Sequence, residues 1–306
     1  MGKEGTEEGN TVPSLRLADL RYWLNCTEAV VSSKEKEEHA TELKEALEAK
    51  AMTPLYRVVA EELAWKVEDA TLAELRARNE AKVVELNANL VDAEENLGES
   101  EVRAALLAQS EYYCQIGAKE LTLEAYRKTL EKTVGPGEKL DVVFALIRVG
   151  FFWNDRELVV RNLDKAREML VTAGDWDRRN RSRVYEGVQL MASRNWEKAA
   201  GLFLEALATF TCVELCTFEQ FVFYTVVVAL PSLPRPELKS RVIDSPDVLS
   251  VIDSLPGLGD LLNSFYNLDY QTFFQSLAVV TDTMKKDRYL GALAGYFCRE
   301  MRIKAY

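Results

Sequence analysis

Apolar residues recur along this chain at intervals of three and four positions, the spacing that places them on one face of an α-helix. The pattern predicts helices over 15–24 and 33–50 and another from residue 55, followed by a long helix with a short heptad stripe. The stripe consists of Val83, Leu86, Leu90, Ala93 and Leu97. Because it spans so few heptads, we expect it to pack within the chain rather than against a second molecule.

Local signals suggest where several of these helices begin and end. Thr53-Pro54 is typical of an N-cap followed by proline in the first helical position. Thr71 and Glu74 have the spacing of a capping box and predict the start of the long helix, which Gly98 is placed to end. Five of the 8 prolines lie between residues 231 and 256, so we expect short helices and turns there.

One stretch, 187–206, has the small and aromatic positions of a tetratricopeptide-like repeat, a pair of antiparallel helices. Those positions are held by Gly187, Trp196, Ala199, Phe203 and Ala206. Ser110 and Gly150 take the place of Gly187 in two earlier units, so the spacings are 40 and 37 residues. We interpret these residues as repeat core. A single unit cannot bury its apolar face, so the repeats predict a stacked array that binds other proteins.

Charge is distributed unevenly, with a net value of −11. Residues 1–100 contain 22 acidic and 12 basic residues, whereas the remainder is nearly neutral. This balance argues against nucleic-acid binding, which requires clustered lysine and arginine. The one basic cluster, in 178–183, lies next to Asp175 and Asp177, and we interpret it as a neutralised helix start, with phosphate binding as the alternative.

Residues for catalysis or metal binding are sparse. The single histidine, His39, lies among charged residues and is expected on a solvated helix face. The sequence contains no zinc-ligand motif, no histidine-based triad and no phosphate-binding loop. Cys212 and Cys216 would share a helical face and, like the other cysteines, are interpreted as buried free thiols. We therefore predict no catalytic, cofactor-binding or metal site, no cofactor and no enzyme activity.

The sequence offers no membrane segment or secretory signal. The longest apolar run, 221–230, is about half as long as a bilayer requires. The polar N-terminal segment does not resemble a signal peptide. We therefore expect a cytoplasmic and nuclear protein that does not associate with membranes.

Several sequence blocks, in one collinear order, resemble a known family. They are residues 92–101, 125–129, 174–181, 273–280, 284–287 and 299–303. From about residue 50 onward the chain is similar to the proteasome non-ATPase regulatory subunit 6 family, helical-repeat subunits of the lid of the 26S regulatory particle. The resemblance implies a non-catalytic scaffold in ubiquitin-dependent protein degradation, assembled as a hetero-oligomer with other lid and base subunits.

The resemblance also implies an all-α fold, in which a repeat solenoid leads into the helical part of a PCI domain. We expect a flexible segment and short helix over 1–32, N-terminal helices over 33–98, repeats over 99–192 and the PCI part over 193–306. The family continues past Ile303 into a winged helix that is largely missing here. This suggests a fragment, an incomplete gene model or a shortened paralogue. We therefore expect Phe297 and Met301 to lack packing partners.

Three alternatives remain open at this point. The first is subunit one of the COP9 signalosome, a related repeat–PCI scaffold. The second is a general helical-repeat adaptor that binds C-terminal peptides through a lysine–arginine clamp, although Arg103, Lys119 and Arg148 form no evident clamp pair. The third is an RNA-binding PCI protein. The sequence does not identify the partner-binding residues.

Overall fold

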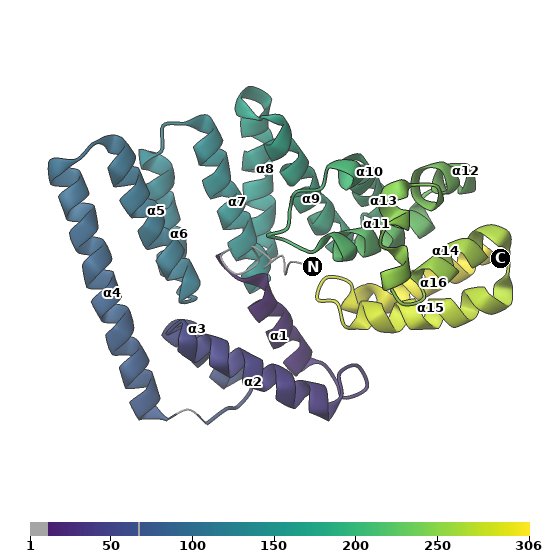
Figure 1. Cartoon of the computed structure of the whole chain (residues 1–306), viewed down its shortest axis with the longest axis horizontal. Helices are drawn as coiled ribbons and strands as arrows, with labels where there is room; N and C mark the ends of the chain where they lie inside the picture. The colour runs from purple at the N-terminus through teal and green to yellow at the C-terminus, as the bar shows by residue number, and fades with distance from the viewer. Residues whose placement is uncertain (1–11, 67) are drawn as a thin grey trace, which may run out of the picture. The chain divides into compact units, whose positions relative to one another are not determined.

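The computed structural model describes residues 12–66 and 68–306, and within those ranges the chain is all-α, as predicted (Figure 1). The chain divides into two compact units, Met1–Ala173 and Gly174–Tyr306. The expected domain boundaries after residues 32, 98 and 192 stay predictions. The expected flexibility of the first residues concerns positions 1–11, which lie outside the described part.

Within the residues described, unit 1 contains eight helices, of which five form a row. They are α1 (Leu15–Asn25), α2 (Ser33–Ala49), α3 (Thr53–Glu62), α4 (Asp69–Asn96), α5 (Glu99–Gln115), α6 (Lys119–Lys132), α7 (Pro136–Trp153) and α8 (Arg156–Ala173). Figure 1 shows α4 to α8 side by side, and each packs on the next. The helix α1 packs against α2 and α7. The row buries a core cluster contributed by α5, α6, α7 and α8, including Tyr126, Val149 and Leu158.

The long helix α4 is attached to its neighbours by a buried amide. Asn79 donates from Nδ2 to the Thr53 hydroxyl of α3 at 3.0 Å, and its Oδ1 accepts from the Tyr112 hydroxyl of α5 at 3.0 Å. The predicted packing of the heptad stripe within the chain is confirmed for Leu86 and Ala93, which are buried where α4 contacts α5, but not for Leu97, which is exposed. Satisfying both polar ends of Asn79 fixes the register of three helices at once.

Of the two predicted ends of α4, the start is wrong and the end is confirmed in position. The helix begins at Asp69 and its N-cap is Glu68, so Thr71 lies inside the first turn and forms no capping box. The negative charge of Asp69 in that turn interacts favourably with the positive end of the helix dipole. The helix α4 does end just before Gly98, since Leu97 is its C-cap residue. Gly98, at φ −89°, does not take the left-handed conformation of a glycine cap and is also the N-cap of α5. A capping box does form at Ser32 and Glu35, where none was predicted.

Unit 2 contains the remaining helices. They are α9 (Trp176–Ala192), α10 (Trp196–Ala206), α11 (Phe218–Ser232), α12 (Arg235–Leu238), α13 (Pro246–Leu249), α14 (Leu258–Asn267), α15 (Tyr270–Lys285) and α16 (Ala294–Ala305). Short 3₁₀ or π turns occupy Leu207–Thr209, Lys239–Ile243, Ile252–Ser254 and Gly291–Leu293. The prediction of short helices in the proline-rich stretch is confirmed by α12 and α13.

The apolar run 221–230 forms the central helix of unit 2. Every residue from Phe221 to Leu230 is buried, because α11 packs against α10, α14 and α16. A helix that is apolar all round belongs in the middle of a core, and this explains why its sequence shows no amphipathic pattern. Among the described residues, no helix is both long and apolar enough to cross a membrane.

The expectation that Phe297 and Met301 lack packing partners is wrong. Both side chains are fully buried, since α16 packs against α11 and α15. The ring of Phe297 lies 6.0 Å from that of Trp196. Lys304 then ties the end of α16 to the end of α11 by donating to the Leu230 carbonyl at 2.8 Å. The helices α10, α11 and α15 therefore supply the contacts that the sequence alone did not reveal.

A buried carboxylate joins α11 to the turn before α16. The hydroxyl of Tyr224 donates to Asp287 Oδ2 at 2.6 Å, and Asp287 Oδ1 accepts from the backbone amides of Tyr289 and Leu290 at 2.8 and 2.9 Å. Burial raises the pKa of Asp287, while these hydrogen bonds oppose the rise. Folding therefore shifts this carboxyl toward its protonated form relative to the unfolded chain.

We expect this site to make stability pH-dependent in a defined direction. Between the unfolded pKa near 3.8 and the raised folded value, the folded state binds more protons than the unfolded state. The contribution of Asp287 is therefore fully present below the unfolded pKa and is lost as pH rises through the folded pKa. Unfolding by urea at pH 4 and pH 7 should show the native chain losing stability relative to Asp287→Asn as pH rises.

The matched control is Asp282→Asn, which removes an exposed carboxylate on α15. This control should not reproduce the relative change seen with Asp287→Asn. A constant difference between the native chain and Asp287→Asn across that pH range would contradict the assignment.

Candidate interaction surfaces

Each repeat helix pair crosses at a small residue. At Gly187 on α9, a Cβ atom would lie 2.3 Å from Cε1 of Phe203 on α10. At Gly150 on α7, it would lie 2.6 Å from Cγ2 of Val159 on α8. Contacts this short are excluded for real side chains, so glycine is what allows each pair of helices to approach. In the first pair, Ser110 fills this position and its hydroxyl lies 2.9 Å from that of Thr129.

The predicted core residues of the last repeat all lie inside unit 2. Ala199, Phe203 and Ala206 are fully buried, and Trp196 is nearly so. The indole of Trp196 donates to the Met191 carbonyl at 3.0 Å and meets the ring of Tyr296 edge-on at 5.0 Å. These side chains are consequently unavailable to a partner protein. Any interaction surface must lie on other faces of the helices.

The basic cluster at the start of α9 is neutralised by carboxylates. Asp175 caps the helix by accepting from the Arg178 amide at 2.8 Å and also pairs with the Arg178 guanidinium. Arg183 pairs with Glu205 at 3.2 Å. These contacts bear out the interpretation of a neutralised helix start for Arg178 and Arg183. The neighbouring Trp176 is 61% exposed, so it takes no part in this capping.

A third arginine of this cluster, Arg181, forms a more buried network. Arg181 donates from Nε and Nη2 to Oε1 of Glu214, at 3.0 and 2.8 Å, and the Tyr185 hydroxyl donates to the same oxygen at 3.1 Å. The side chain of Glu214 is only 9% exposed. This network holds the connection between α10 and α11 against α9. Because Glu214 lies far from Arg181 in sequence, the pattern of charges did not reveal it.

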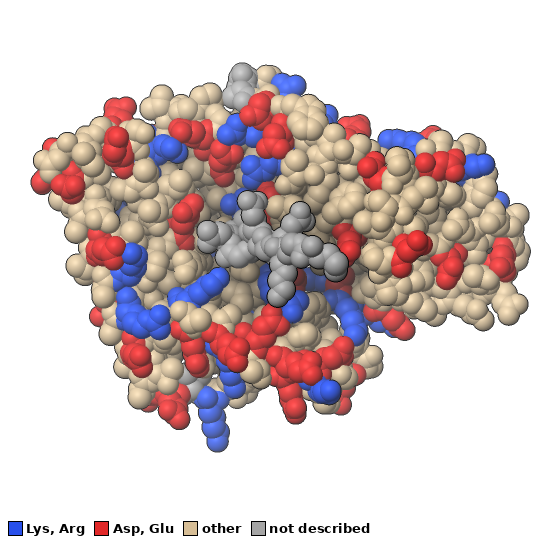
Figure 2. Space-filling view, in the orientation of Figure 1, with Lys and Arg blue, Asp and Glu red and all other residues tan. Residues whose placement is uncertain are grey.

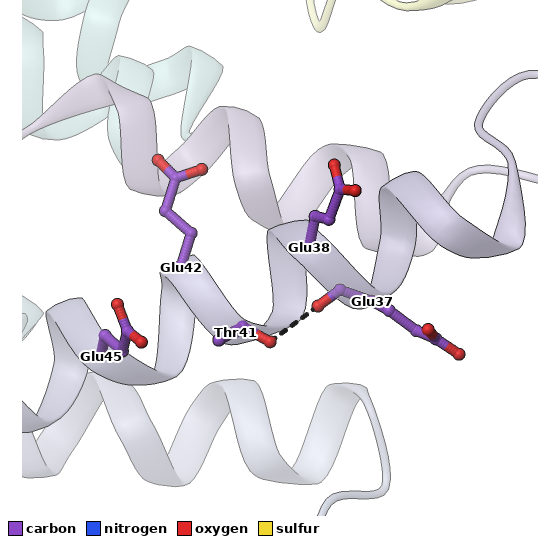
Figure 3. Close-up of a pocket in the computed structure, with 5 residues that line it drawn as sticks. All are labelled: Glu37, Glu38, Thr41, Glu42 and Glu45. Atoms are coloured by element: carbon purple, nitrogen blue, oxygen red, sulfur yellow. Dashed lines mark hydrogen bonds between the residues drawn. The ribbon is translucent and has the colours of Figure 1, made fainter.

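Acidic side chains gather along α2, in the lower part of unit 1 in Figure 2. They line an open hollow of about 430 Å³ formed by Glu37, Glu38, Thr41, Glu42 and Glu45. Figure 3 shows Glu38 and Glu42 projecting from the same side of the helix while Glu37 points away. Glu42 is not free, because it accepts from Arg16 Nε and Nη2 at 2.9 Å each, and this pairing holds its pKa below the usual value.

The lone histidine is less solvated than expected. His39 is half-buried, and its ring lies 4.7 Å from the ring of Trp23 on α1. The guanidinium of Arg16 covers the same tryptophan at 4.7 Å. The prediction of a plain solvated face is therefore wrong, because Trp23 on the neighbouring helix provides an aromatic surface for it. His39 has a packing role between α1 and α2.

Within the described ranges, no three His, Cys, Asp or Glu side chains are placed to hold a metal ion. Cys114, Cys212 and Cys216 are buried free thiols, as predicted, whereas Cys26 and Cys298 are free but only partly buried. Burial raises the pKa of Cys114 to about 12. Cys212 and Cys216 do not share a helix. They lie in the turn that precedes the N-cap residue Thr217, so the expected helical face is wrong.

Two of the three candidate clamp cations, Arg103 and Lys119, are paired with carboxylates. Arg103 contacts Glu138 at 2.9 Å, and Lys119 contacts Asp155 at 2.7 Å. Arg148 lies near Glu111. Burial raises the pKa of Glu111, and the positive charge of Arg148 only partly offsets this rise. Cations held by neighbouring carboxylates are poorly suited to capture the carboxylate of a peptide. This arrangement argues against a peptide-clamp adaptor.

Comparison with known proteins agrees with this picture. A family model described as 26S proteasome subunit RPN7 matches residues 68–241. The chain belongs to the RPN7 family. The 26S proteasome non-ATPase regulatory subunit 6 of Dictyostelium discoideum is 45% identical over 295 residues, which are 96% of this chain and 76% of that protein.

Two further RPN7-family relatives extend the similarity to plants and yeast. The 26S proteasome non-ATPase regulatory subunit 6 of Oryza sativa subsp. japonica is 41% identical over 98% of this chain and 77% of its own length. The 26S proteasome regulatory subunit RPN7 of Saccharomyces cerevisiae is 34% identical over 97% and 75%. The matches extend over nearly the whole chain, so they include both units. They carry the names of proteasome subunits and do not favour the signalosome alternative.

Proposed function

We propose that this chain is a non-catalytic scaffold subunit in the lid of the 26S proteasome regulatory particle, acting in ubiquitin-dependent protein degradation. The observation that carries the proposal is its membership of the RPN7 family over both units. Its partners are then other lid and base subunits, and its location is the cytoplasm and nucleus. The predicted repeat solenoid and PCI part, with the four segments given above, belong to the same proposal.

The architecture supports a scaffolding role because it offers long helix faces to other proteins. Stacked helix pairs expose long faces whose geometry is set by a rigid core. The glycine crossings, with Phe203 and Val159 filling the space, keep that core closely packed. The acidic surface of unit 1 is suited to complementary basic surfaces on partner proteins and disfavours nucleic acid. A scaffold requires no cofactor.

Affinity purification of the tagged chain from its own cells tests the proposal. We expect the chain to copurify with proteasomal ATPase-ring and lid subunits. Recovery with cullin-linked components instead would identify a signalosome subunit, and salt-sensitive retention of RNA would identify an RNA-binding PCI protein. A purified chain with its own peptidase or deubiquitinase turnover would contradict the non-catalytic role.

A further inference from the structure

The helix α4 has a second apolar face opposite the one it buries. Its members are exposed and alternate by three and four positions: Ala70, Ala73, Ala77, Ala81, Val84, Ala88 and Val91. We call them the outer stripe. The buried positions Leu75, Asn79, Leu86 and Ala93 lie about 170° around the helix axis from it, at roughly 100° per residue. In Figure 1, α4 has α5 on one side and is the end helix of the row.

The two valines set the outer stripe apart from an ordinary solvated face. Val84 is 67% exposed and Val91 50% exposed, seven residues apart on the same line. The stripe advances seven positions for every two turns, which is the repeat of a coiled coil. Between its first and last members lie about 32 Å of helix at 1.5 Å per residue. Isolated exposed valines are ordinary. A heptad repeat of alanine and valine that continues over this length is the pattern that a partner helix covers.

The charges beside the outer stripe indicate what kind of helix fits. Exposed carboxylates flank it on one side at Glu74, Glu85 and Asp92, and on the other at Glu80 and Glu94. The helix α4 has only three basic residues, and two of them are bonded to neighbouring oxygen atoms. Lys82 pairs with Glu85 at 2.7 Å, Arg78 donates to the Glu48 and Ala49 carbonyls, and Arg76 is the exposed exception. The stripe is thus bordered by net negative charge.

We propose that the outer stripe of α4 is a docking site for an amphipathic helix of a partner subunit, with small or aliphatic residues in its seam and lysine or arginine beside them. The alanines let the two backbones approach closely, while Val84 and Val91 fill the partner's holes. A second copy of this chain does not fit, because two acidic borders would face each other. The inference rests on the proposed function as a subunit of a larger assembly, and it identifies the outer stripe as a surface that binds another subunit.

A photo-crosslinking residue at Val84 of the full chain, expressed in its own cells, tests the proposal directly. After irradiation of the purified assembly, mass spectrometry should locate an adduct on one helical segment of net positive charge in another subunit. The same probe at Val134, which is 76% exposed between α6 and α7, is the control and should not react with that segment. No adduct from position 84 in the assembly, an adduct to a second copy, or one to an acidic segment would overturn the inference.

A pair of substitutions measures how much the stripe contributes. Val84→Glu with Val91→Glu should reduce recovery of the crosslinked subunit at least tenfold, since apolar seam positions become charged beside like charges. Glutamate is a better helix former than valine, so α4 should keep its helicity by circular dichroism. The matched control is Leu121→Glu with Val160→Glu, two exposed apolar positions on α6 and α8, and should retain that subunit.

These outcomes separate the docking inference from the proposed function. If the native chain copurifies with proteasome subunits and the α4 variant is recovered equally well with every one of them, the docking inference fails alone. If the native chain does not copurify with proteasome subunits, the proposed function fails. In that second case, a crosslink from position 84 to a basic helix of whichever assembly the chain enters would still support the docking inference. Without such a crosslink, the docking inference fails as well.

Discussion

Replacing Phe203 with alanine is expected to lower the free energy of unfolding by about 3–5 kcal/mol, the usual cost of emptying a fully buried aromatic site. The ring fills the space that Gly187 leaves at the α9–α10 crossing and meets the ring of Phe221 edge-on at 5.1 Å. Its removal therefore leaves a cavity between the last repeat and the central helix α11. Urea denaturation of the full chain, followed by circular dichroism, measures the change.

A second substitution on the same helix provides the control. Gly201 has no atom within 4 Å of the position a Cβ would take, so Gly201→Ala introduces no clash. Because alanine loses less backbone entropy in a helix, this variant should be more stable by about 0.5–1 kcal/mol. If Phe203→Ala costs less than about 1 kcal/mol, the crossing is not the close-packed core described above.

Removing the carboxylate of Glu214 is expected to destabilise the protein by about 3 kcal/mol. In the Glu214→Ala variant, the mostly buried Arg181 guanidinium and the Tyr185 hydroxyl both lose their acceptor. Deleting one partner of a buried ion pair leaves an uncompensated charge, which costs more than the pair itself contributed. The same urea measurement should show the loss, together with earlier unfolding of the α10–α11 connection in hydrogen exchange.

Glu205→Ala is the matched control for this pair. Glu205 on α10 pairs with Arg183 on α9, but both side chains are well exposed at 56% and 38%. Surface pairs contribute about 0–1 kcal/mol, so this variant should be nearly neutral. Equal effects of the two substitutions would contradict the distinction in burial on which the prediction depends.

Helix positions and the general class of the protein could be predicted from sequence because apolar periodicity is a local property. The run 221–230 was visible as apolar, yet only the folded chain shows it surrounded by α10, α14 and α16. On α4, the residues 83, 86, 90 and 93 and the outer stripe both have helical spacing. Which of the two faces is buried depends on α5, and no local pattern encodes that.

The polar contacts were the least predictable part of the structure. Tyr224 and Asp287 are 63 positions apart, and Asn79 is 26 from Thr53. Neither pair has a sequence signature, since each depends on how distant helices meet. The His39 and Phe297 predictions were wrong for the same reason, because Trp23 and Trp196 come from other helices. Partner-binding residues are harder still to predict, since they are defined by molecules outside the chain.

The most direct test of the central claim is sedimentation of a cell extract that contains the tagged chain, with peptidase activity measured in each fraction. A lid subunit should travel with the fractions whose peptidase activity depends on ATP, in constant ratio to a known lid subunit across the peak. The assignment to the 26S proteasome would be contradicted if all of the tagged chain sedimented in other fractions, either as a free chain or in another complex.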